Sequence, residues 1–239
     1  IDLESATENG VLVTNVPDYC VEEVATHTLA LLLASTREII PYDRSVTDGE
    51  WDRDAAGPIH RFSTETVGVV GYGTIGRRVG RFIDTLGATV LASDPFLSAD
   101  DLADDPATLT SFDDLIERSD YVTVHSPLTD ETREMIDLET LRLMRDSAVL
   151  VNVARGEIVD SEALVTALDE GEIAGAALDV YPEEPPAPDH PLRQHPKVIS
   201  TPHVAWYSEE ANLDRRIRAA EQIQAVFEGG RPDHIVSAA

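Results

Sequence analysis

Residues 67–76 of the chain read Val-Gly-Val-Val-Gly-Tyr-Gly-Thr-Ile-Gly. The β-branched run is typical of a buried strand in a parallel sheet. Gly71, Gly73 and Gly76 then have the G-x-G-x-x-G spacing. The first glycine of this motif permits a tight turn, the second lets the backbone approach a pyrophosphate, and the third allows close packing of helix on strand. The stretch therefore predicts a strand, a phosphate-binding turn and a helix whose N-terminus faces an anion.

The residues after the motif support a dinucleotide site. Apolar residues recur there at helical spacing, and Gly87 follows as a helix stop. A second apolar run at 88–92 leads to Asp94, where an acidic residue would bind a ribose 2′-hydroxyl. The alternative is a glycine turn in an α/β protein that binds no nucleotide, since the motif alone is weak evidence. We favour the nucleotide site because strand, helix and acid occur in the required order.

Composition restricts the class of protein. The chain has 239 residues, of which 42% are hydrophobic, enough for one large domain or a domain with attachments. It has 45 acidic and 18 basic residues, giving a net charge of −27, which disfavours binding to nucleic acid or to anionic membranes. The acids are scattered, which favours a salt-adapted surface. A single cysteine, Cys20, excludes an intrachain disulfide, and we expect a cytoplasmic protein from a high-salt cell.

From residue 66 onward the pattern alternates between strand and helix. This alternation predicts an α/β fold with a doubly wound parallel sheet. We expect strands at 66–70, 88–92, 121–125, 148–153, 175–180 and 198–200, and helices at 74–86, 111–118, 138–144 and 161–170. Asp160 and Gly171 have the positions of caps for the last of these helices.

The flanking segments are less regular. We expect the end of a helix at 1–9, a strand at 10–16, and a buried helix at 21–39 that Pro41 ends. Residues 42–62 are predicted to be irregular and to wrap over a neighbour. A helix at 208–228 and a strand-like tail at 234–236 complete the chain.

Three ionisable residues follow three different predicted strands. Arg155 follows the strand at 148–153, Glu184 the one at 175–180, and His203 the one at 198–200. The carboxyl ends of parallel strands form the edge that carries the glycine turn and binds ligands. We therefore expect the three side chains to converge beside a bound dinucleotide.

Their chemistry suits hydride transfer between a nicotinamide and a carbonyl. Histidine can give the carbonyl oxygen its proton, a carboxylate can orient the ring, and arginine can bind a substrate carboxylate. Each residue also has a simpler interpretation. Arg155 could be a surface arginine beside a helix, Glu184 a solvated acid in a proline-rich turn, and His203 a loop cap.

Five segments resemble the D-isomer-specific 2-hydroxyacid dehydrogenase family. They are residues 67–76, 125–129, 151–160, 176–185 and 201–203, in the family's order. The resemblance implies that Arg155 binds the substrate carboxylate and carbonyl, that His203 is the acid/base, and that Glu184 is its partner. It implies NAD as the cofactor, with contacts from Gly71, Gly73, Thr74, Ile75, Gly76, Asp94, Pro127, Thr132 and Asp179. Asp179 matches the position that contacts the nicotinamide carboxamide, and Asp94 the acid that selects NAD over NADP.

A narrower likeness concerns residues 17–24 and 203–209, which are similar to the C-terminal binding protein-like branch. In that branch a tryptophan after the histidine forms a wall of the substrate pocket, so Trp206 is a substrate-binding candidate. A packing role for Trp206 is the alternative. Thr26 stands where the family usually has a glutamate.

The resemblance also implies a domain plan. Family members have a flavodoxin-like substrate domain, and we expect residues 1–17 to be a remnant of it, 18–206 to be the dinucleotide-binding (Rossmann) domain, and 207–239 to return to the substrate domain. We expect the chain to be truncated at its N-terminus, to bind NAD, and to turn over poorly or not at all. The resemblance further implies a homodimer formed through the dinucleotide domains.

The leading functional hypothesis is an oxidoreductase that interconverts a D-2-hydroxy acid and a 2-oxo acid, similar to phosphoglycerate dehydrogenase or to glyoxylate and hydroxypyruvate reductases. The alternative is an NAD(H)-gated interaction protein, like the corepressors of the C-terminal binding protein branch. A metal site of His190, His195 and His203 is disfavoured, because these residues lack the short ligand spacing of metal motifs.

Overall fold

The computed structural model describes residues 1–236 of the chain. The chain divides into two compact units, one formed by Val24–Ala205 and the other by Ile1–Glu23 together with the segment from Trp206 onward. In the part of the chain that is described, no helix combines the length and the apolar character that crossing a bilayer would require.

The larger unit is built on a parallel sheet with strand order β3-β2-β1-β4-β5-β6-β7. Every neighbouring pair in this sheet is parallel. Its strands are β1 (Thr66–Val70), β2 (Thr89–Ser93), β3 (Thr108–Leu109), β4 (Tyr121–Val124), β5 (Val149–Asn152), β6 (Gly175–Leu178) and β7 (Val198–Ser200). The order reverses at β1, and the carboxyl ends of β1 and β4 border the crevice where such sheets bind nucleotides. The predicted doubly wound α/β fold is confirmed.

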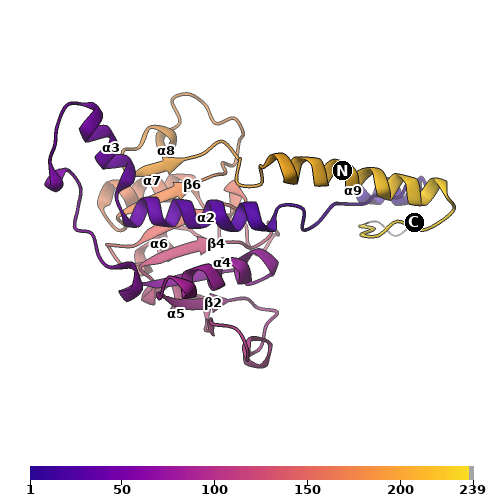
Figure 1. Ribbon diagram of the computed structural model, residues 1–239, viewed down its shortest axis with the longest axis horizontal. Helices are drawn as coiled ribbons and strands as arrows, with labels where there is room; N and C mark the ends of the chain where they lie inside the picture. The colour runs from indigo at the N-terminus through magenta and orange to yellow at the C-terminus, as the bar shows by residue number, and fades with distance from the viewer. Residues whose placement is uncertain (237–239) are drawn as a thin grey trace. The chain divides into compact units, whose positions relative to one another are not determined.

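Helices flank this sheet, with α2 and α4 in front of it and α7 behind it in Figure 1. The helices are α2 (Val21–Thr36), α3 (Ile39–Thr47), α4 (Thr74–Thr85), α5 (Phe112–Arg118), α6 (Leu138–Leu143), α7 (Ser161–Glu170) and α8 (Pro191–Gln194). Short 3-10 helices occur at Arg53–Ala55, Phe62–Thr64, Ala99–Leu102 and Gly156–Ile158. The caps predicted for α7 are confirmed, because Asp160 accepts hydrogen bonds from two backbone N–H groups and Gly171 is left-handed at φ 75°.

The core lies between the sheet and helices α5, α6 and α7. Ile116, Leu141, Leu150, Leu164 and Leu168 are all fully buried in one cluster. Burying each such side chain contributes roughly 1.5–3 kcal/mol relative to leaving it in water. This layer therefore fixes the positions of β4, β5 and β6, whose carboxyl ends are followed by Pro127, Arg155 and Asp179, three of the candidate site residues.

The structure corrects two predictions in this unit. Pro41 does not end a helix: α2 ends at Thr36, Glu38 is left-handed at φ 51°, and Pro41 lies in the first turn of α3. A proline is tolerated there because its missing N–H would have no partner inside the helix. The segment 42–62, predicted to be irregular, contains most of α3 and a 3-10 helix.

The third strand of the sheet, β3, was absent from the sequence prediction. It has two residues, Thr108 and Leu109, too few to show any periodicity.

The smaller unit contains α1 (Leu3–Glu8) and α9 (Glu209–Phe227). The predicted C-terminal helix is confirmed, with the Ser208 hydroxyl accepting the Ala211 N–H at 2.8 Å as its N-cap. The predicted strand at 10–16 is wrong. In this segment only Thr14 forms a β-bridge, an isolated antiparallel one with Ile235 of the predicted strand-like tail. Among the described residues no strand of several residues lies beside the segment to extend the pairing.

Candidate active site

The glycine turn joins β1 to the N-terminus of α4, whose first residues are Thr74 and Ile75. Gly71 has φ 84°, and a Cβ there would lie 2.6 Å from the Ser126 nitrogen. A Cβ on Gly76 would overlap the Gly71 carbonyl oxygen, whereas one on Gly73 would meet no protein atom within 4 Å. The first and third glycines are thus required by the fold itself. The open space at the second fits a pyrophosphate held by the helix N-terminus.

Asp94 lies directly after β2, beside this turn. Its Oδ2 accepts the Tyr72 N–H at 2.9 Å and its Oδ1 accepts the Phe96 N–H at 3.0 Å. The carboxylate is therefore held at the carboxyl end of β2, next to the glycine turn, where a ribose hydroxyl can donate to it.

Tyr72, inside the motif, makes a contact that the sequence did not indicate. Its fully buried ring carries a hydroxyl that donates to Asp105 at 2.5 Å, and Asp105 also lies within 3.4 Å of Arg77. Burial, together with the Asp105 carboxylate, raises the pKa of the Tyr72 phenol. The hydroxyl has room only because residue 80 is glycine, since a Cβ there would overlap it.

Replacing Gly80 by alanine is expected to destabilise the fold by about 1–3 kcal/mol, because the new methyl group overlaps the Tyr72 hydroxyl. Adding Tyr72→Phe removes that hydroxyl. The double variant should therefore lose clearly less free energy of unfolding than the sum of the losses in the two single variants. Urea unfolding in molar KCl measures this, with Gly57→Ala as the control because no atom lies within 4 Å of its Cβ position. Additive effects would refute the packing argument.

The turn after β4 carries Pro127 and Thr132. The Thr132 hydroxyl donates to the Pro127 carbonyl at 2.6 Å and accepts the Thr129 N–H at 2.8 Å. This turn begins at His125, whose N–H donates to the Val70 carbonyl at the end of β1. It therefore lies at the same sheet edge as the glycine turn. Burial lowers the pKa of His125 to about 3, so this imidazole is neutral at physiological pH and is no candidate proton donor.

Arg155 follows β5, and the Asn152 side chain holds the backbone of the turn that carries it. The Asn152 amide donates to the Arg155 carbonyl at 2.8 Å, and its Oδ1 accepts the Ala154 N–H at 3.0 Å. The guanidinium is exposed and donates to the Ala154 carbonyl at 2.6 Å. Next to it Gly156 packs so closely on the backbone of Tyr181 that a Cβ would overlap it. This close approach brings the chain after β5 against the chain after β6.

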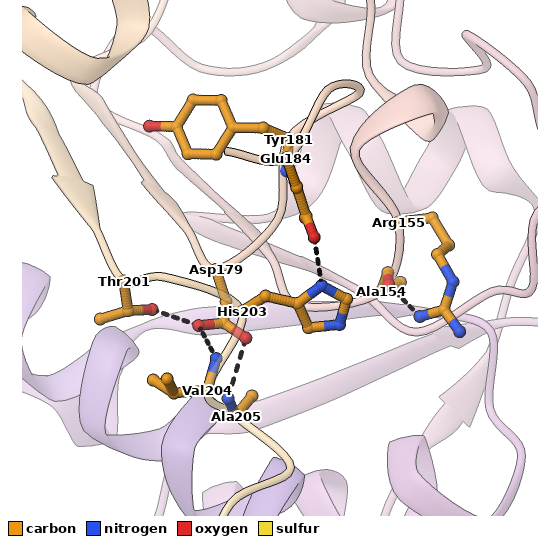
Figure 2. A network of polar contacts seen from close by, with 9 residues as sticks. All are labelled: Ala154, Arg155, Asp179, Tyr181, Glu184, Thr201, His203, Val204 and Ala205. Carbon is orange, nitrogen blue, oxygen red and sulfur yellow. Dashed lines mark hydrogen bonds and ion pairs between the residues drawn. The ribbon is translucent and has the colours of Figure 1, made fainter. Parts of the chain in front are cut away.

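Glu184 and His203 form the centre of the site (Figure 2). The Glu184 Oε2 lies 2.5 Å from the His203 Nδ1, while its Oε1 accepts the Tyr181 N–H at 3.0 Å. An ionised carboxylate is only an acceptor, so Nδ1 carries a hydrogen and Nε2 is the nitrogen left to exchange a proton. Figure 2 shows Nε2 on the side of the ring where Arg155 lies.

Asp179, at the end of β6, is 1% exposed. Its carboxylate accepts hydrogen bonds from the Thr201 hydroxyl at 2.5 Å, the Val204 N–H at 3.0 Å and the Ala205 N–H at 2.9 Å. The residue thus anchors the loop that carries His203, a role that the sequence did not suggest. A cavity of about 390 Å³ borders Asp179, Glu184, Thr201 and His203.

The structure brings Arg155, Glu184 and His203 to one sheet edge with the glycine turn. Trp206 belongs to the smaller unit, where its ring centroid lies 6.4 Å from that of Tyr19 and 4.8 Å from the Arg215 guanidinium. The other histidines of the disfavoured metal site have separate partners: His195 lies 3.4 Å from Asp169, and His190 packs edge-on against Tyr181.

Comparison with known proteins identifies the family that the chain resembles. The model of the D-isomer specific 2-hydroxyacid dehydrogenase NAD binding domain matches residues 29–205. The chain is 41% identical to a D-3-phosphoglycerate dehydrogenase of Archaeoglobus fulgidus over 96% of its own length and 43% of that enzyme's. It is 40% identical to a glyoxylate reductase of Aeropyrum pernix, of which it covers 72%. A D-lactate dehydrogenase of Aquifex aeolicus, solved with NAD and lactic acid, superposes with a TM-score of 0.90 at 31% identity, with 100% of this chain and 77% of that one covered.

Proposed function

Since this chain belongs to the D-isomer-specific 2-hydroxyacid dehydrogenase family, we propose that it carries the cofactor-binding and catalytic residues of an NAD-dependent oxidoreductase that interconverts a D-2-hydroxy acid and a 2-oxo acid. The observation that carries the proposal is the 2.5 Å contact between Glu184 and His203, at the sheet edge that also presents Arg155 and the glycine turn. The chain spans less than half the length of the phosphoglycerate dehydrogenase it matches.

NAD suits the residues at this edge. The open space at Gly73 and the N-terminus of α4 would hold the pyrophosphate, and Asp94 would accept a hydrogen bond from the adenosine ribose. Pro127 and Thr132 would border the cofactor on the β4 side, and Asp179 would lie near the nicotinamide carboxamide. The bound cofactor supplies or accepts the hydride.

The remaining chemistry falls to three side chains. Arg155 would bind the substrate carboxylate through its planar guanidinium and polarise the 2-oxo group. His203 would donate the proton on Nε2 to the carbonyl oxygen during reduction and remove it during oxidation. Glu184, held by the Tyr181 N–H, would stabilise the imidazolium and fix the ring.

Asp94 is expected to set the preference for NADH over NADPH. Replacing it by alanine removes a carboxylate that repels a 2′-phosphate, so the ratio of the Kd for NADPH to that for NADH should fall by about tenfold or more. Fluorescence titration of both cofactors measures the ratio, with the exposed Asp84→Ala as the charge-matched control. If Asp94→Ala leaves this ratio of Kd values unchanged, Asp94 does not contact the cofactor ribose.

The proposed reaction is tested by the stereochemistry of its product. Full-length protein is incubated with NADH and glyoxylate, hydroxypyruvate, pyruvate or phosphohydroxypyruvate, and the products are separated by chiral chromatography. The proposal expects the D-isomer from every chiral product that forms. Formation of the L-isomer would contradict it.

We further propose that residues 18–206 form the dinucleotide-binding domain, and that 1–17 and 207–239 belong to a substrate domain. We also propose that two chains form a homodimer through their dinucleotide-binding domains. The apolar side chains of Ile39 and Val46 on α3 and of Trp51 in the loop after it are exposed, which supports an interface there. The net charge of −27 supports a salt-adapted cytoplasmic protein. Light scattering in molar KCl should give the mass of two chains, and a single-chain mass would contradict the dimer.

A further inference from the structure

The loop that carries the catalytic histidine is held by one buried carboxylate. Asp179 accepts hydrogen bonds from Thr201, Val204 and Ala205, on both sides of His203 in sequence. The Asp179 carbonyl also accepts the His203 N–H at 2.8 Å. His203 itself has φ 52°, in the left-handed region that a non-glycine residue adopts only where its surroundings hold it.

A second histidine reaches this network from a distant part of the sequence. His27 lies in α2, and its Nε2 is 3.0 Å from the Thr201 hydroxyl oxygen and 3.6 Å from the Asp179 Oδ1. The site residues discussed above all follow the sheet's carboxyl edge, whereas His27 comes from a helix that precedes the sheet. Nothing in the local sequence pairs it with Thr201.

The contacts fix which ring nitrogen of His27 carries the hydrogen. A threonine hydroxyl has one proton, and the 2.5 Å contact with the Asp179 carboxylate, which is only an acceptor, uses it. The Thr201 oxygen can therefore only accept from His27. Nε2 must be the protonated nitrogen, whether the ring is neutral or charged.

We propose that His27 is a positioning residue for His203, acting through Thr201 and Asp179. Its Nε2–H polarises the Thr201 hydroxyl, which strengthens the hydrogen bond to Asp179. Asp179 in turn holds the Thr201 side chain before His203 and the backbone N–H groups of Val204 and Ala205 after it, so that the ring meets Glu184. This inference rests on the proposed function for its effect on turnover, although its effect on the loop does not.

The alternative is that His27 only packs α2 on the sheet. Two substitutions separate the possibilities. His27→Gln places an amide N–H close to the position of the imidazole Nε2–H, whereas His27→Leu removes the donor while filling similar space. A pure packing role predicts that leucine is tolerated at least as well as glutamine. A positioning role through the Nε2–H predicts the opposite order.

The first test needs no turnover. Long-range ¹H–¹⁵N spectra of the 239-residue chain in molar KCl are expected to show the Nε2–H tautomer for neutral His27. Amide hydrogen exchange of Val204 and Ala205 is expected to quicken by about tenfold in His27→Leu and to stay near wild type in His27→Gln. Thr201→Val, which removes the hydroxyl at similar volume, should behave like His27→Leu. An Nδ1–H tautomer, or equal exchange in the leucine and glutamine variants, would overturn the proposal.

The second test measures turnover in the full-length protein. His27→Leu should lower kcat by about tenfold with the KM for NADH unchanged, and His27→Gln should recover most of it. The exposed His60→Leu is the control. If wild type binds NADH and reduces no 2-oxo acid while the exchange results hold, the proposed function fails and the positioning role stands. If wild type turns over and His27→Leu matches it, the positioning role alone fails.

Discussion

Replacing His203 by asparagine is expected to lower kcat/KM for 2-oxo acid reduction by roughly 10²–10⁴-fold, the range that a positioned general acid contributes. Asparagine tolerates the left-handed backbone at this position (φ 52°), so the loop should keep its conformation. It cannot deliver the proton that His203 Nε2 would supply. The measurement is NADH oxidation under saturating cofactor, together with NADH binding by fluorescence.

The control for this variant is His60→Asn, at an exposed histidine far along the chain from the site. NADH binding should change little in His203→Asn, because the ring is proposed to act on the substrate oxygen. Glu184→Gln should cause a smaller loss, since it retains a side chain that can contact Nδ1 but lacks the charge that favours imidazolium. If His203→Asn turns over at the wild-type rate, His203 is not the general acid.

Arg155→Gln is expected to lower kcat/KM by about 10²-fold, equivalent to about 3 kcal/mol, because it removes charge-assisted hydrogen bonds to the substrate carboxylate. Most of the loss should appear as a higher KM for the 2-oxo acid. Arg155→Lys keeps the positive charge but lacks the planar guanidinium, so its kcat/KM should lie between those of wild type and Arg155→Gln. Among the described residues the exposed guanidinium donates only to the Ala154 carbonyl, so the free energy of unfolding should change by less than about 0.5 kcal/mol.

The matched control is Arg142→Gln, which breaks a surface pairing with Glu170 and Glu172 outside the site. It should leave KM for the 2-oxo acid unchanged. Equal effects of the two arginine variants on KM would show that general surface charge, not substrate binding by Arg155, is responsible.

Much of the larger unit was predictable because its signals are local. The strand at 66–70 and the helix at 161–170 match the structure residue for residue, since a β-branched run and a pair of caps mark their ends. The alternation of strands and helices also predicted which residues share the carboxyl edge of the sheet. Parallel topology is sufficient to bring Arg155, Glu184 and His203 to one edge.

The rest depends on contacts between distant residues. His27 contacts Thr201 at a separation of 174 residues in sequence, and the Tyr72 hydroxyl contacts Asp105 at a separation of 33. Neither contact can be predicted from a local sequence pattern. Asn152 is different. It ends β5 three residues before Arg155, and an asparagine where a strand gives way to a turn typically binds the backbone of that turn, so this contact has a local signal in the sequence. Pro41 was misread because a proline suits the first turn of a helix as well as the end of one.

The most direct test of the central claim is NADH oxidation by full-length wild-type protein against a panel of 2-oxo acids in molar KCl, beside His203→Asn. We predict that the wild-type protein reduces at least one 2-oxo acid and that His203→Asn loses this turnover while it retains NADH binding. NADH binding by both proteins with no turnover on any acid would contradict it and would favour an NAD(H)-gated interaction protein.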